Sequence, residues 1–319
     1  MLICVAGDIH GRIERMYGDV LSFEHQIGMQ FDYVLQVGDF GVWPDPDRID
    51  RATRRHEGAG DFAAWLRAGR SVPRRTVFIK GNHEDFEWLN RANSPELLPG
   101  LTWLPNGHSL ELSDPKAGVL RIGGIGGCYG ASDYERTARK LQGYARRHYT
   151  HDEVAKLASA PRIDILMTHD APAGIRFEKR GGAHVYVSNA AGLDTLLSKT
   201  RPRLCLFGHH HARVNADIAG VRCVGLNCIG RAGNLVALDM DVGSGDWSVR
   251  AEFPPVTKKP RECREGCGDV NALEQTTERD IEEAWNCEID RRAAQLDSGT
   301  AETIPWETAR ARLRRAVQA

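Results

Sequence analysis

Five short clusters of histidine, aspartate and asparagine carry side chains that can bind metal ions. Each cluster follows a short apolar run, and the five are Asp8-Ile9-His10, Gly38-Asp39, Gly81-Asn82-His83-Glu84, Thr168-His169 and Gly208-His209-His210-His211. Carboxylate, amide and imidazole groups form a mixed oxygen and nitrogen set that suits Zn, Mn or Fe better than Ca or Mg. Two such ions, bridged by a carboxylate, lower the pKa of a shared water and hold phosphate oxygens. The clusters therefore predict a dinuclear site for phosphate-ester hydrolysis.

Each cluster taken alone has a simpler explanation. Asp8 could cap a helix, Asn82 could be a turn residue and His169 could be an oriented or exposed histidine. The run from His209 to His211 could be a chance histidine-rich tract. Their conjunction argues against these alternatives, because five clusters in a fixed order all follow apolar runs, with glycine where the backbone must approach an ion.

The apolar runs before the clusters are typical of buried strands in an α/β fold. They are short, rich in Val, Ile, Leu and Phe, and end in glycine or polar residues. They occupy residues 2–6, 33–37, 76–80, 119–122, 163–167 and 204–207. Helices are predicted between several of them, at Asp61 to Arg70, Asp152 to Ala158 and Asn189 to Ser198. Because ligands gather at the carboxyl ends of strands in such sheets, we expect the clusters to share one edge.

The length and composition of the chain predict one large domain with an appendage. The 319 residues are 41% hydrophobic and 27% charged, and the formal net charge is -1. That charge gives no global attraction to nucleic acid or membrane, so such affinity requires a local patch. A proline- and charge-rich segment, PPVTKKPRE, follows Phe253. We therefore predict a catalytic domain at 1–253, a linker at 254–276 and a helical tail at 277–319.

The sequence also predicts a cytoplasmic location. No stretch approaches the roughly 20 uninterrupted apolar residues that span a bilayer. Met1 leads directly into an apolar, strand-like segment, without the charged region and cleavage site of an export signal.

In this order, the motifs GDIHG, GDF, GNHE, THD and GHHH resemble those of the calcineurin-like metallophosphoesterase superfamily, over about residues 1–253. The resemblance implies two packed β-sheets flanked by helices, and an enzyme that hydrolyses phosphate esters with two Mn, Fe or Zn ions. By motif position, it implies a first metal held by Asp8, His10, Asp39 and His211. It implies a second metal held by Asn82, His169 and His209, with Asp39 as the bridge.

The same resemblance implies a catalytic role for His83, which would contact the phosphate and help the leaving oxygen to depart. His210, between two implied ligands on an alternating segment, is predicted to point away from the metals. One motif departs from the family. A second carboxylate often follows in the order G-D-x-x-D and supports the residue at the His83 position, but here that position is Val42. The departure leaves His83 without a candidate partner and argues against a close likeness to the Ser/Thr protein phosphatases.

The GDF variant, with RIGGIGGCYGASDY and THDAP, resembles the RNA lariat debranching branch, in which a 2′,5′-phosphodiester is hydrolysed. Between Cys128 and Thr150, tyrosines alternate with basic residues: Tyr129, Tyr134, Tyr144 and Tyr149 with Arg136, Arg139, Lys140, Arg146, Arg147 and His148. Cations that neutralise phosphates and rings that stack on bases are what single-stranded nucleic acid binding requires. The alternative is a solvated basic face with tyrosines packed beneath it.

These patterns lead to one main prediction and two alternatives. The main prediction is a phosphodiesterase that acts on RNA or nucleotide substrates. The first alternative is a phosphomonoesterase or protein phosphatase, which the missing second carboxylate disfavours. The second is a catalytically silent binding scaffold, against which the complete ligand set argues.

The predicted tail has one apolar stripe on a charged helix. Its members recur at helical spacing and are Ile281, Trp285, Ile289, Ala293 and Leu296. The stripe could simply pack against the catalytic domain. The stretch EIDRRAAQLDSGTAETIPWETARARLRR, however, resembles bacterial addiction-module components of the antitoxin type. That resemblance implies a bacterial source and a tail that binds a partner protein or a second copy.

Overall fold

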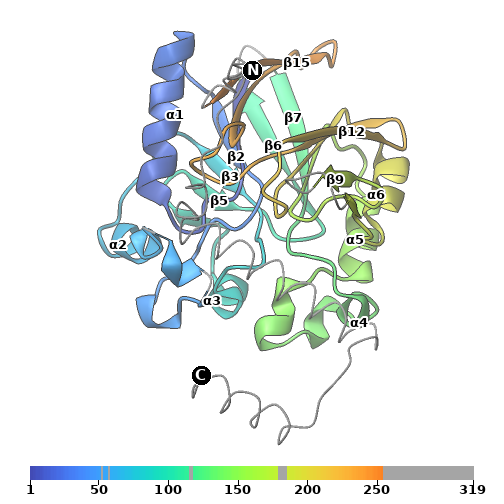
Figure 1. Ribbon diagram of the computed structural model, residues 1–319, viewed down its shortest axis with the longest axis horizontal. Helices are drawn as coiled ribbons and strands as arrows, with labels where there is room; N and C mark the ends of the chain where they lie inside the picture. The colour runs from blue at the N-terminus through green and yellow to red at the C-terminus, as the bar shows by residue number, and fades with distance from the viewer. Residues whose placement is uncertain (52, 57, 115–117, 179–184, 254–319) are drawn as a thin grey trace, which may run out of the picture. The chain divides into compact units, whose positions relative to one another are not determined.

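The computed structural model describes residues 1–51, 53–56, 58–114, 118–178 and 185–253. The chain divides into two units, Met1–Lys258 and Lys259–Ala319. The predicted linker and helical tail therefore lie outside the described residues. Within the first unit, two β-sheets pack against each other and helices cover their outer faces (Figure 1). The predicted α/β fold of two packed sheets flanked by helices is thus confirmed.

The first sheet has seven strands. Their order is β15 (Trp247–Phe253), β14 (Leu235–Met240), β1 (Leu2–Ala6), β2 (Tyr33–Gln36), β3 (Thr76–Phe78), β5 (Leu101–Trp103) and β4 (Glu96–Leu98). Strands β1, β2, β3 and β5 run parallel, so their carboxyl ends share one edge. The outer face packs against α1 (Ile13–Ile27) and α2 (Asp61–Arg67) through residues that include Phe23, Phe62 and Trp65.

The second sheet has six strands. Their order is β12 (Val214–Ile218), β13 (Val221–Gly225), β11 (Leu204–Phe207), β8 (Ile165–Thr168), β7 (Gly118–Ile125) and β6 (His108–Asp114). The central strands β13, β11, β8 and β7 are parallel. Helices α5 (His151–Ala158) and α6 (Leu193–Thr200) cover the outer face, where Leu157, Leu193 and Leu197 are buried.

Shorter elements complete the described part of the chain. They are α3 (Phe86–Arg91), α4 (Ala131–Tyr134), the antiparallel pair β9 (Arg176–Glu178) and β10 (Val185–Val187), and the 3-10 helices η1 (Pro46–Arg48), η2 (Thr53–Arg55), η3 (Ala138–Lys140) and η4 (Gly143–Arg147). None of the helices in the described ranges is long and apolar enough to cross a bilayer.

The core between the sheets explains the continuous apolar runs of the sequence. Val5 and Leu35 from the first sheet pack with Ile122, Met167 and Leu206 from the second, and all five are buried. Strands covered on both faces need apolar residues at every position rather than at alternate ones. All six predicted strands are present, and this double burial is the reason that they could be recognised.

The predicted helices are present with shifted ends, and helices α1, α3 and α4 were not predicted. Helix α2 ends at Arg67 rather than at residue 70, and α6 begins at Leu193 rather than at residue 189. Helix α1 buries Ile13, Met16, Val20 and Phe23, a helical spacing that is visible in the sequence.

Candidate metal centre

Loops at the carboxyl ends of five parallel strands bring the predicted ligands together. Strand β1 is followed by Asp8 and His10, β2 by Asp39, β3 by Asn82 and His83, β8 by His169, and β11 by His209 and His211. The first three strands belong to the seven-stranded sheet and the last two to the six-stranded sheet. The cluster therefore lies where the edges of the two sheets meet.

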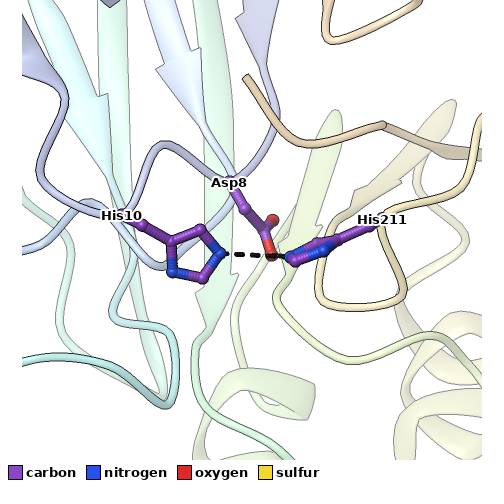
Figure 2. Close-up of side chains that lie close together, drawn as sticks. All are labelled: Asp8, His10 and His211. Atoms are coloured by element: carbon purple, nitrogen blue, oxygen red, sulfur yellow. Dashed lines mark hydrogen bonds and ion pairs between the residues drawn. The ribbon is translucent and has the colours of Figure 1, made fainter. Parts of the chain in front are cut away.

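The first group of side chains consists of Asp8, His10 and His211, whose rings and carboxylate converge on one point (Figure 2). The Nε2 atoms of His10 and His211 are 3.1 Å apart. His211 Nε2 also lies 3.1 Å from Oδ2 of Asp8. Ligand atoms about 2.0–2.1 Å from a tetrahedral ion lie about 3.3 Å from one another. The spacing of these three groups therefore fits a bound transition metal.

The second group is built around Asp39 and His169, together with Asp8. His169 Nε2 lies 3.6 Å from Oδ1 of Asp39 and 3.0 Å from Oδ1 of Asn82. The other Asp39 oxygen, Oδ2, faces Nδ1 of His10 at 3.8 Å. The side chain common to both groups is that of Asp8, and the bridging role of Asp39 stays a prediction.

His209 lies beside the second group, and His210 contacts a different carboxylate. The rings of His209 and His169 have centroids 5.0 Å apart, and the His209 backbone N–H donates to both Asp8 oxygens at 3.1 Å. His210 instead places Nε2 3.0 Å from Asp170 and packs its ring 4.2 Å from that of Phe177. These contacts are those of a packed, hydrogen-bonded side chain, and the lack of a metal role for His210 stays a prediction.

Four of the predicted ligands have left-handed backbone, which non-glycine residues rarely adopt. The φ angles are 48° for His10, 53° for Asp39, 62° for His209 and 47° for His211. Such conformations cost on the order of 1 kcal/mol or more each and concentrate at functional sites. Backbone strain in this chain is therefore concentrated at the loops that aim side chains into the cluster.

Three glycines allow the loops to approach these side chains. A Cβ atom would lie 2.0 Å from Asp39 Oδ1 at Gly81, 2.2 Å from Asp8 Oδ1 at Gly208 and 2.3 Å from His169 Nδ1 at Gly38. Any larger residue would displace a predicted ligand, because these distances are shorter than nonbonded contact.

The protonation states of His10, His209 and Asp39 fit metal binding, and that of His211 does not. Burial lowers the pKa of His10 and of His209 to about 3, which leaves both rings neutral at pH 7. Burial opposes ionisation of Asp39, but the neighbouring imidazoles hold its pKa below the usual range. Burial alone would lower the pKa of His211, but its contact with Asp8 raises it, so this ring must lose a proton to bind a metal. His10 Nδ1 is buried without a hydrogen-bond partner. His169 Nδ1 donates to the Val37 carbonyl at 2.8 Å, and its Nε2 faces the cluster. Neutral imidazoles and ionised carboxylates are the ligand forms that divalent metals need.

His83 has a carboxylate partner, which corrects the sequence analysis. Its Nδ1 lies 3.1 Å from Oδ2 of Asp50, in the segment between η1 and η2. Burial alone would lower the pKa of His83, but the charges of Asp39 and Asp50 raise it to about 9. Asp50 therefore replaces the carboxylate that the G-D-x-x-D motif would have supplied at Val42. The signal available in the sequence was an acidic residue in the charged stretch PDPDRID.

Glu84 and His56 are further site residues that the sequence analysis did not single out. The buried Glu84 carboxylate accepts the backbone N–H groups of Phe40, Gly41 and Val42 at 2.8, 2.9 and 2.6 Å. It thereby fixes the loop after Asp39 to the loop that carries His83. The His56 ring stacks on that of His10, with centroids 4.6 Å apart.

The tyrosines of the basic segment are mostly packed into the protein. Tyr149 is fully buried, and Tyr129 and Tyr134 pack against the same core. Tyr144 is 56% exposed, and the Arg147 guanidinium lies 4.2 Å from its ring. Three of the four tyrosines are therefore packed beneath the basic residues, as the alternative interpretation of the segment predicts. Tyr144 is the exposed one.

Comparison with known proteins identifies the family. The model of the calcineurin-like phosphoesterase family matches residues 1–213, and the chain belongs to this family. The protein is a metallophosphoesterase, with groups of Asp and His side chains placed to hold metal. A separate addiction-module component family matches residues 271–309, which are outside the described ranges.

The curated relatives include several lariat debranching enzymes. The one from Entamoeba histolytica is 23% identical over 262 residues, which cover 75% of this chain and 72% of that protein. The one from Schizosaccharomyces pombe is 26% identical over 246 residues, 68% of this chain and 50% of its own length. The chain thus spans between half and three quarters of these two relatives. A solved crystal structure aligns with 78% of this chain over 97% of its own length, with a TM-score of 0.51 and 12% sequence identity. This similarity shows a shared fold alone.

Proposed function

We propose that this metallophosphoesterase is a dinuclear phosphodiesterase that acts on RNA or nucleotide substrates. The observation that carries the proposal is the convergence of Asp8, Asp39 and three histidines at the meeting edges of the two sheets. The similarity to lariat debranching enzymes supports a diester over a monoester.

The proposed ligands fall into two sets that share Asp39. Asp8, His10 and His211 would hold one ion, and Asn82, His169 and His209 the other, with Mn, Fe or Zn as the candidate metals. When bound, such a pair supplies a water of lowered pKa and neutralises charge on the phosphate oxygens.

His83 is proposed to donate a proton to the leaving oxygen. The charges of Asp39 and Asp50 raise its pKa to about 9 against the effect of burial, so its ring carries the proton near neutral pH. Asp50 occupies Nδ1 and leaves Nε2 to face the substrate. The His83 backbone N–H donates to Asp39 Oδ1 at 2.8 Å, which fixes the ring relative to the proposed bridging carboxylate.

A phosphomonoesterase remains the second candidate, because one observation favours it. The missing second carboxylate was the argument against this function, and Asp50 supplies that carboxylate from another part of the chain. A silent scaffold is disfavoured by the full set of ligand side chains and by the strain retained in their backbone.

A panel assay of metal-loaded protein separates these candidates. We expect hydrolysis of bis-p-nitrophenyl phosphate and of branched RNA with a higher kcat/KM than that of p-nitrophenyl phosphate. An Asp39→Asn variant, prepared in parallel, controls for contaminating activity. A strong monoester preference would replace the diesterase proposal with the phosphomonoesterase, and no turnover of any ester would favour the scaffold.

For the tail, we propose a partner-binding role, which the match to the addiction-module component family at residues 271–309 supports. The partner is a second protein or a second copy of this chain. Light scattering of the full chain and of Trp285→Asp tests self-association, and an unchanged monomeric mass in both would leave a different protein as the partner.

A further inference from the structure

A recess adjoins the loop that carries Asn82 and His83. A cavity of about 570 Å³ is bounded by α3, by the segment that leads from β5 to β6, by η3 and by α5. A smaller cavity of about 170 Å³ shares Lys80, Asn90, Ala138, Arg139 and Glu153 with it. The combined recess is within the roughly 300–1,000 Å³ of small-molecule sites.

The walls of the recess combine aromatic rings with positive charge. Phe86 and Trp103 line the larger cavity, and Arg146 lines the smaller one. Arg139 lines both, is exposed, and has no hydrogen-bond or ion-pair partner among the described residues. Lys80 donates from Nζ to the Arg146 carbonyl at 2.6 Å, and its charge also interacts with that of Glu153.

The two acids of the recess are already engaged by other groups. Asp152 accepts the Ala138 backbone N–H at 3.1 Å and the Thr150 hydroxyl at 2.6 Å. Glu153 accepts the Thr150 backbone N–H at 3.0 Å and the Asn106 side-chain amide at 3.1 Å. The recess is lined by four cations, Lys80, Arg139, Arg146 and Lys156, and by these two acids, so its net charge is positive and favours an anionic ligand.

Two wall residues also carry buried polar atoms that lack partners. They are Nε1 of Trp103 and Oγ1 of Thr137. Buried donors of this kind are normally satisfied in native proteins. Both atoms are covered by protein, so a ligand in the recess would contact other parts of Trp103 and Thr137.

We propose that the recess is a subsite for one nucleotide of the substrate, with its base against the half-buried Trp103 and its phosphate beside Arg139. Aromatic faces that stack on bases and cations that neutralise phosphates are the two elements of single-strand recognition. Lys80 and Phe86, which line the recess, flank the loop of Asn82 and His83 in the chain. The inference rests on the proposed diesterase function.

Filling the recess tests the proposal. Ala138→Trp places a ring in both cavities, and Ala158→Trp is the matched control, because Ala158 is a half-buried alanine of α5 that lines neither. The readout is the ratio of kcat/KM for an RNA oligonucleotide to kcat/KM for bis-p-nitrophenyl phosphate. We expect Ala138→Trp to lower this ratio about tenfold, the size of one lost stacked base, and Ala158→Trp to keep it within about twofold.

A charge reversal provides a second variant that does not depend on packing. Arg139→Glu changes an exposed side chain, and Lys199→Glu makes the same change at an exposed position of α6. We expect a lower ratio for the first and an unchanged ratio for the second. Equal ratios in each pair of variants would overturn the subsite.

Binding of adenosine 5′-monophosphate, measured by calorimetry on metal-loaded protein, separates the inference from the proposed function. We expect wild type and Ala158→Trp to bind one more equivalent than Ala138→Trp, since binding at the metals is common to all three. If that difference holds but no diester is cleaved, the diesterase proposal fails and the recess stands as a nucleotide site. If it holds while the ratios stay equal, the recess takes a free mononucleotide and the substrate subsite is overturned.

Discussion

The loops around the metal centre and the segment from 129 to 149 lie at the same edge of the molecule but are held in different ways. In the first region, Asp8, Asp39 and His169 are almost completely buried at the ends of parallel strands. In the second, Arg139 and Tyr144 are exposed on the short 3-10 helices η3 and η4.

This difference separates two tasks. Bond breaking needs groups held within fractions of an ångström, which strand ends can provide. Contacts to a flexible strand of nucleotides tolerate more variation, because charge and stacking depend weakly on angle. Changes in the first region should therefore affect every substrate, and changes in the second mainly the large ones.

The largest effect is expected from Asp39→Asn, which removes the charge of the proposed bridge. We expect less than one equivalent of metal by elemental analysis. We also expect an activity loss on all esters that exceeds the about 10²–10⁴-fold worth of a positioned acid or base. Asp133→Asn, in α4, is the control and should keep both metals. Full metal content in the Asp39 variant would contradict the bridging assignment.

His83→Ala should keep both metals and lose activity by about 10²–10⁴-fold, because the proton donor is gone while the ligands remain. Asp50→Asn should lose less, about 10–100-fold, as is typical of a partner that orients a catalytic group. Asp50 raises the pKa of His83, so its loss should also move the alkaline fall of kcat to lower pH. Normal turnover of the His83 variant would show that its proposed role is wrong.

The double variant Arg146→Ala and Arg147→Ala tests the second region, the segment from 129 to 149. Each arginine that contacts a phosphate releases counterions, so KM for an oligonucleotide should rise and its salt dependence should become shallower. We expect about a fivefold to tenfold rise in KM at moderate salt, with kcat nearly constant. Equal losses of kcat on oligonucleotide and small diester would instead show that the segment is structural.

The smallest effect is expected on stability and comes from Asp170, which contacts residues of both regions. It accepts the Tyr129 backbone N–H at 2.8 Å and contacts His210 Nε2 at 3.0 Å. Burial opposes its ionisation, but the His210 contact holds its pKa below the usual 3.8. Because this pKa is depressed in the folded state, the carboxylate stabilises the protein above about pH 4, and that contribution is lost as pH falls.

Asp170→Asn should therefore lower the free energy of unfolding by about 1–3 kcal/mol at pH 7. The difference from wild type should shrink below about pH 4, as measured by urea denaturation. Asp194→Asn, on α6, is the control. A difference independent of pH would show that the charge of Asp170 does not contribute.

The sequence was sufficient for the strands and the ligand clusters because both are local patterns. Double burial makes the strands continuous apolar runs, and each cluster directly follows its strand. The Asp50–His83 pair could not be predicted in this way, because the turns of η1 and η2 determine where Asp50 lies. The packing of Tyr129, Tyr134 and Tyr149 could not be predicted either. Their segment is irregular, so it has no periodicity that distinguishes buried from exposed positions. The assignment of the seven ligands and of His83 stays a prediction.

The placement of ligands on both sheets has a consequence for the lifetime of the protein. Asp8 and His10 follow β1 of one sheet, and His211 follows β11 of the other. An ion bound by these three residues would join the two sheets, and only the folded chain can bind it in this way. Metal present at about 100 times its dissociation constant would then add about 2.7 kcal/mol per site to the free energy of unfolding. A cell short of metal would lose this enzyme to proteolysis as well as to inactivity, so metal supply would set its abundance.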